Sequence, residues 1–168
     1  MNLTKKRPKL NIPKTKSEWV WDILGYSCYV GSIILLIIVW GKLPDKAPAH
    51  INGAGEVTRW GSKWVLAIIP TIGLFSGLFM QAFEYYPEIY NYPKRFNESN
   101  AKQFYLNGRK MINQMKNIML SISSLILLEM TLIALDWHNG FGKWFLPLII
   151  SAIFIPMIIG MIRQSKIK

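Results

Sequence analysis

Three residues in the segment 43–63 carry side chains that could act together chemically: His50, Asn52 and Glu56. If this stretch is extended, His50 and Asn52 point to the same face. The two glycines that follow allow a turn that brings Glu56 back alongside. A histidine beside a carboxylate is suited to general acid–base catalysis. The same side chains could instead hydrogen-bond the backbone of the segment and fix its shape.

Metal binding is a third interpretation of the segment. His50 and Glu56 would need further ligands, and Asp136 and His138 are available from another connection. This spacing matches no known ligand signature, so the sequence predicts neither a metal site nor a cofactor. The single cysteine, Cys28, excludes an intramolecular disulfide and a cysteine-rich metal site.

A carboxylate, Glu129, interrupts the third apolar run, and Asp136 follows seven residues later on the same helical face. A charge at the centre of a bilayer costs ~2.5–3.5 kcal/mol even on permissive scales. Glu129 must therefore face the protein interior, be protonated, or be hydrogen-bonded. Its candidate hydrogen-bond partners in the other runs are Ser32, Thr71, Ser76 and Ser151. A functional and a structural role for Glu129 both stay open.

Four apolar runs must position these groups. They cover residues 23–41, 64–83, 117–137 and 144–162, each close to the ~20 residues that a helix needs to cross a ~30 Å hydrocarbon core. Hydrophobic residues make up 51% of the chain, which is too apolar for an ordinary soluble domain. We predict an all-α integral membrane four-helix bundle as a single domain over 23–162, with basic tails at 1–22 and 163–168.

The net charge of +11 could suggest nucleic acid, but the distribution of Lys and Arg indicates a membrane topology. Fifteen of the 20 lie in the two tails and the second connection, and five lie in the first and third connections. Because cytoplasmic segments are enriched in Lys and Arg, both termini are predicted to be cytoplasmic. Residues 42–63 then form an ordered extracytoplasmic loop. The expected partners are membrane lipids, and no nucleic acid.

The second connection, residues 84–116, is predicted to begin with irregular, tyrosine-rich backbone. Asn97 or Asn100 can cap a helix that runs on into the third span. Within it Lys102, Arg109 and Lys116 repeat every seven residues and form one basic face. That amphipathic face is either a solvated helix extension or a docking surface for a cytoplasmic regulator.

Two motifs carry a family resemblance. The first has the form LP-x3-P-x-H-x-N-x2-GE-x3-WGSK, and its residues are Leu43, Pro44, Pro48, His50, Asn52, Gly55, Glu56, Trp60, Gly61, Ser62 and Lys63. The second precedes the third span and comprises Asn91, Pro93, Asn100, Tyr105 and Arg109. In this order they resemble the small membrane module of SdpI-type bacterial immunity proteins. The Pro-Asp pair usual after Gly-Glu is replaced here by Val57-Thr58.

The resemblance implies a protein of the bacterial cytoplasmic membrane that protects against a secreted toxin, or senses envelope stress, through its outer loop. It implies no catalytic residues. An alternative is an ion-coupled transporter or membrane-embedded enzyme that uses Glu129 and His50. A further alternative is a membrane dock for a cytoplasmic regulator. The identity of the toxin and the oligomeric state stay open.

Overall fold

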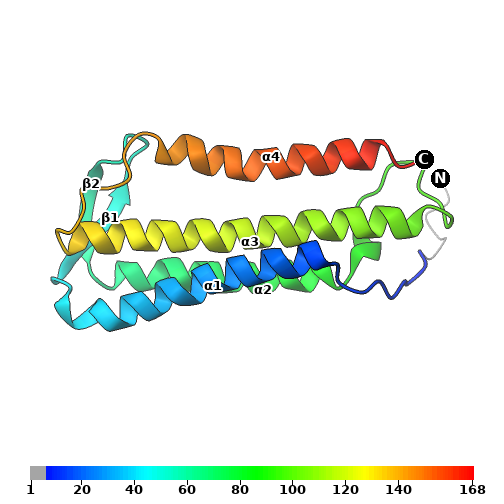
Figure 1. The fold of residues 1–168 in the computed structure, drawn as a ribbon. Helices are drawn as coiled ribbons and strands as arrows, with labels where there is room; N and C mark the ends of the chain where they lie inside the picture. Colours follow the sequence, from blue (N-terminus) through cyan, green and yellow to red (C-terminus); the bar gives the residue numbers. More distant parts are fainter. Residues whose placement is uncertain (1–6) are drawn as a thin grey trace.

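The computed structural model describes residues 7–168. Four long helices run side by side, and a small β-hairpin covers one end of them (Figure 1). The helices are α1 (Lys16–Val39), α2 (Val65–Glu84), α3 (Ala101–Ala134) and α4 (Phe145–Ser165). Each is long and apolar enough to cross a membrane. The prediction from the apolar runs is confirmed at this level: the chain is a mostly helical, multi-pass membrane protein.

Helix α3 is the central element. Helices α1 and α2 pack against one side of α3, and α4 packs against its other side (Figure 1). More than half of the apolar stretch of α3 is buried, 56%, compared with 6% for α4. Helix α4 therefore has few fully buried residues, while α3 is the most buried of the four helices.

The hairpin consists of β1 (Lys46–Ile51) and β2 (Val57–Ser62), paired antiparallel and joined to α1 by the short 3-10 helix Trp40–Lys42. The strands confirm the extended shape expected for this segment and add a small β element to the all-α prediction. Ala47 of β1 is fully buried in a core cluster that includes Leu36 of α1, Leu66 of α2 and Leu127 of α3. The hairpin is thus seated on the ends of three helices, at what we call the hairpin end.

The opposite end, which we call the tail end, holds residues 7–15, the tyrosine-rich connection and the C-terminal residues. The connection contains the 3-10 helix Pro87–Ile89. Helix α3 begins directly after Asn100, one of the two residues suggested as its cap, but the Asn100 side chain makes no capping hydrogen bond. Helix α1 begins at Lys16, inside the stretch 1–22 that was predicted as a basic tail. Residues 7–15 lie against the helices, where Arg7 stacks on Tyr92; residues 1–6 lie outside the described part.

Candidate functional site

A cavity of about 430 Å³ lies at the hairpin end, between the hairpin and helices α2, α3 and α4. Its walls are mostly apolar side chains, among them Ile69 of α2, Ile126 of α3 and Ile149 of α4. His50 and Asn52 contribute from the hairpin. The volume lies within the range of small-molecule binding pockets. This cavity is the candidate functional site.

Glu129 is the charged residue among the described residues that line the cavity, and it is only 2% exposed. Its Oε1 accepts a hydrogen bond from the backbone N–H of Phe141 at 2.7 Å. Its Oε2 makes no hydrogen bond to any residue within 7–168. The site therefore contains a buried carboxylate that keeps hydrogen-bonding capacity.

Glu129 lies close to the hairpin end of α3. It precedes the end of α3 at Ala134 by five residues, or ~7.5 Å along the axis. None of the expected partners Ser32, Thr71, Ser76 and Ser151 bonds to it; the Ser32 and Thr71 hydroxyls donate to carbonyls of their own helices. The α3–α4 connection folds back over the end of α3, and its backbone, through the Phe141 N–H, provides the hydrogen bond to Glu129.

The hairpin turn uses Asn52 and Glu56 to fix its own shape. The Asn52 Oδ1 accepts hydrogen bonds from the N–H groups of Ala54 at 2.9 Å and Glu56 at 3.0 Å. The Asn52 Nδ2 donates to the Glu56 carboxylate at 3.0 Å. The His50 Nδ1 lies 2.5 Å from the Thr58 hydroxyl. His50 therefore pairs with Thr58, and the anticipated acid–base pair with Glu56 is not formed.

The tip of the hairpin docks onto the α3–α4 connection through two glycines. Gly55 has φ +84°, and a Cβ atom at this position would lie 2.7 Å from the Cα of Gly142. Only glycine allows both this backbone conformation and this approach. The contact closes the cavity on the side of the connection.

The residues proposed as metal ligands do not come together. Asp136 is exposed with a left-handed backbone, φ 54°, and does not line the cavity. His138 accepts a hydrogen bond from the Gly140 N–H through its Nδ1 at 3.0 Å. In the described range no three His, Cys, Asp or Glu residues are placed to hold a metal ion.

The other residues of the outer motif shape the hairpin or join it to the helices. Leu43, before the hairpin, and Pro48, in β1, are buried, while Pro44 and Trp60 are exposed. A Cβ atom at Gly61 would lie 3.1 Å from the Ala49 Cβ, so the two strands approach closely there. The Ser62 Oγ accepts a weak hydrogen bond from the Trp64 N–H at 3.5 Å. The Lys63 ammonium lies over the Trp40 ring, 5.7 Å from its centroid.

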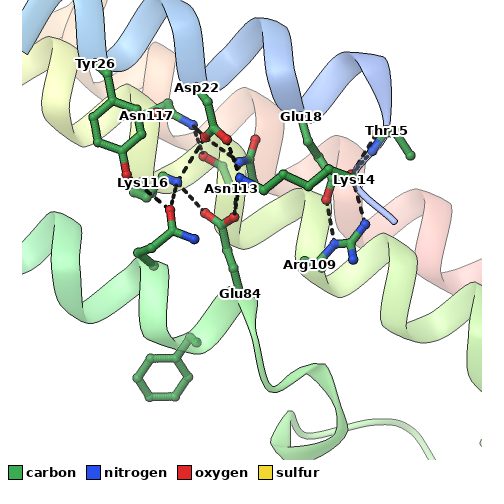
Figure 2. A network of polar contacts seen from close by, with 12 residues as sticks. Lys14, Thr15, Glu18, Asp22, Tyr26, Glu84, Arg109, Asn113, Lys116 and Asn117 are labelled. Carbon is green, nitrogen blue, oxygen red and sulfur yellow. Dashed lines mark hydrogen bonds and ion pairs between the residues drawn. The ribbon is translucent and has the colours of Figure 1, made fainter. Parts of the chain in front are cut away.

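A second polar site, which the sequence analysis missed, lies inside the tail half of the protein. Figure 2 shows acidic side chains of α1 and α2 facing basic and amide side chains of α3. The Lys116 Nζ is 3.0 Å from the Asp22 Oδ1 and 2.7 Å from the Glu84 Oε1. The Asp22 Oδ1 also accepts from the amides of Asn113 at 2.8 Å and Asn117 at 2.9 Å. We call Lys14, Glu18, Asp22, Glu84, Arg109 and Lys116 the charge cluster.

Arg109 joins the segment before α1 to α3. Its guanidinium donates to both Glu18 oxygens, at 2.7 and 3.1 Å, and to the Ile12 and Pro13 carbonyls. Glu18 in turn completes a capping box with Thr15 at the start of α1. The interaction fixes the entry of the chain into the first span.

The prediction of an exposed basic face along α3 is therefore wrong for two of its three residues. Lys102 is exposed, but Arg109 is 8% exposed and Lys116 is fully buried. Both are turned inward because the carboxylates of α1 and α2 compensate their charges. A signal was available, since Asp22 precedes one apolar run, Glu84 follows another, and both lie at the same predicted membrane surface as Lys116.

The remaining inner-motif residues belong to an aromatic layer next to the cluster. Tyr105 is fully buried, and its ring centroid lies 5.6 Å from that of Tyr92. Tyr92 stands between the motif residues Asn91 and Pro93 in the sequence. The Asn100 Nδ2 donates to the Arg95 carbonyl at 3.0 Å. Burial raises the pKa of Tyr92, so its hydroxyl stays protonated and donates to the Pro87 carbonyl at 2.8 Å. These residues hold the connection against α3.

The fold and the site define a multi-pass membrane protein with a hairpin-covered cavity at one end and a buried charge cluster toward the other. A family model described as a domain of unknown function (DUF1648) matches residues 29–74. The match runs from the middle of α1 through the hairpin into α2. It thus includes the hairpin part of the candidate site. No curated protein and no solved structure matches the chain.

Proposed function

We propose that this chain is a bacterial cytoplasmic-membrane protein of the SdpI type that protects the cell by binding a secreted toxin in the hairpin-covered cavity. The observation that carries the proposal is the cavity itself, bounded by His50 and Asn52 of the outer motif and by Glu129 of α3. The motif resemblance supplies the link to self-protection. A binding role agrees with a hairpin whose polar residues mainly fix its shape.

The proposed orientation puts the hairpin outside the cell and both termini in the cytoplasm. It rests on the excess of Lys and Arg in the tails and the second connection. A secreted molecule would then reach the cavity without crossing the membrane. The lipid-exposed surfaces of α2 and α4 make membrane lipids the constant neighbours of the site.

Deletion of the gene and challenge with sterile-filtered medium from stationary cultures of the parent strain tests the proposal. The deletion strain should lose viability, and expression of the wild-type chain should restore it. His50→Ala should restore survival poorly at normal protein levels, whereas the matched control Arg59→Ala, at an exposed position of β2, should restore it fully. Equal survival of parent and deletion strains would remove the proposal.

One observation favours a second candidate, an ion-coupled transporter or membrane-embedded enzyme: Glu129 and His50 line the same cavity. This function predicts a pH-dependent activity that is lost in Glu129→Gln. The hypothesis of a docking surface for a cytoplasmic regulator relied on an exposed basic face of α3. Arg109 and Lys116 are buried, so they do not form such a face.

A further inference from the structure

We propose that the cavity under the hairpin binds a small amphiphilic amine, a molecule with one alkyl chain and one protonated amino group that pairs with Glu129. The inference rests on the proposed function, since it takes this cavity as the place where the toxin is bound. It adds the chemical class of the ligand.

The walls of the cavity suit an alkyl chain. Ile69, Ile126 and Ile149 face the space from three different helices. Burial of apolar surface is favourable and non-directional, so these walls provide affinity without fixing an exact ligand shape. The polar groups lie at the hairpin and at Glu129, so a ligand that fits must have one polar end.

The burial and the hydrogen bonding of Glu129 indicate the charge of that polar end. The carboxylate is 2% exposed and holds a single hydrogen bond, from the Phe141 N–H to Oε1. A buried carboxylate needs pairing as well as hydrogen bonding to compensate its lost hydration. An ammonium group offers a positive charge together with N–H donors. It would provide what the protein around Oε2 does not.

The lining disfavours an anionic ligand. Among the described residues around the cavity there is no Lys and no Arg. An acid of the same chain length would meet the Glu129 carboxylate without a compensating cation. The site should therefore distinguish amine from acid by charge, which is the discrimination that the experiment measures.

The cavity is reachable from the lipid. Ile68 of α2 and Leu146 of α4 both line it, and they are 53% and 45% exposed. Residues that line the cavity and are also exposed mark its openings. Ile68 and Leu146 mark one between these two helices, and His50 and Gly53 mark another at the hairpin. An amphiphile dissolved in the membrane could thus enter laterally, with its polar end beside the hairpin.

The test uses the full chain in phosphatidylcholine nanodiscs, with empty discs as background. Binding of radiolabelled dodecylamine and dodecanoate is measured at neutral pH. The wild type should bind dodecylamine at least tenfold more tightly than dodecanoate. Glu129→Gln should lower the amine affinity at least tenfold, while Asp136→Asn, an exposed carboxylate at the same end, should change it less than twofold. Equal binding of amine and acid, or an unchanged Glu129→Gln, would overturn the inference.

A second variant keeps the test decisive if Glu129→Gln does not fold. Ile149→Phe narrows the cavity from α4 and leaves the carboxylate in place. It should weaken dodecylamine binding, and undiminished binding would overturn the inference. Failure of amine binding in a wild-type protein that still protects cells would reject the ligand class alone. Selective amine binding in a protein whose deletion leaves survival unchanged would reject the protective function alone.

Discussion

Lys116 and Asp22 form an ion pair inside the protein, with Nζ 3.0 Å from Oδ1, although the two residues are 94 positions apart in the chain. The pair belongs to a cluster of three basic and three acidic side chains, from α1, α2, α3 and the segment before α1: Lys14, Glu18, Asp22, Glu84, Arg109 and Lys116. Its formal charges cancel. Charged groups in a membrane protein are tolerated in this paired, inward-facing arrangement.

Lys116→Met should destabilise the protein by about 3–5 kcal/mol, because removal of one of three cations leaves one buried carboxylate charge uncompensated. Asp22 and Glu84 would each lose a cation within 3.0 Å. Thermal and chemical unfolding in detergent measures the effect. The control is Lys102→Met, which makes the same change at an exposed position of α3. Equal stability of the two variants would show that the cluster does not hold the helices together.

Arg109→Lys should release residues 7–15 from the helices while α3 stays folded. A lysine ammonium cannot reproduce the forked contacts of a guanidinium with Glu18 and two carbonyls. Hydrogen exchange of the amides in residues 7–15 should accelerate. The exposed Arg163→Lys is the control, and equal protection in both variants would contradict the prediction.

Gly55→Ala should separate the hairpin tip from the α3–α4 connection. The left-handed backbone costs an alanine about 1–2 kcal/mol, and its Cβ would overlap Gly142. We expect a lower unfolding temperature and weaker ligand binding. Gly31→Ala, in α1, should instead be neutral or stabilising, because the added Cβ would meet no atom within 4 Å apart from its chain neighbours and the backbone of its own helix. A stable Gly55→Ala with unchanged binding would show that the contact does not close the cavity.

Asn52→Ala and His50→Ala should separate structure from function within the outer motif. Asn52 fixes the turn through two backbone hydrogen bonds, each contributing about 0.5–1.5 kcal/mol, so its loss should lower stability. His50 makes side-chain contact with Thr58 and should be dispensable for folding. Unfolding in detergent measures both. A His50→Ala variant as unstable as Asn52→Ala would assign both residues to the scaffold.

The orientation can be tested by cysteine labelling in a Cys28→Ser background. Arg59→Cys places a thiol on the hairpin and Lys102→Cys places one at the tail end, both at exposed positions. A membrane-impermeant maleimide added to intact cells should label Arg59→Cys, and should label Lys102→Cys only after lysis. The reverse pattern would put the hairpin in the cytoplasm and end the proposal of an outer binding site.

The four helices could be predicted, because long apolar runs are a local signal. The start of α3 was expected near Asn97 or Asn100 and lies at Asn100, although its side chain makes no capping hydrogen bond. The extended stretch around His50 could also be predicted from its glycines and prolines. The partner of Glu129 could not be predicted. Its hydrogen bond depends on how the α3–α4 connection folds over the end of α3, and no periodicity of the sequence encodes that path.

The charge cluster shows a different limit. A repeat of seven residues places Lys102, Arg109 and Lys116 on one face of the helix. The repeat does not indicate which of these residues pack against carboxylates of other helices. Lys102 precedes Lys116 by almost four turns, and the acidic residues of α1 and α2 reach only the later two. The pattern therefore predicted the helix correctly and the environment of two of its residues incorrectly.

The cancellation of charge within the cluster has a consequence for biogenesis. In the proposed orientation, before the helices associate, Arg109 and Lys116 are unpaired cations that would help retain their connection in the cytosol. After association they are neutralised by Glu18, Asp22 and Glu84. In that orientation the same ammonium and guanidinium groups would serve first as a topology signal during insertion and later as ion pairs that join the helices. A substitution there acts on two successive stages of assembly.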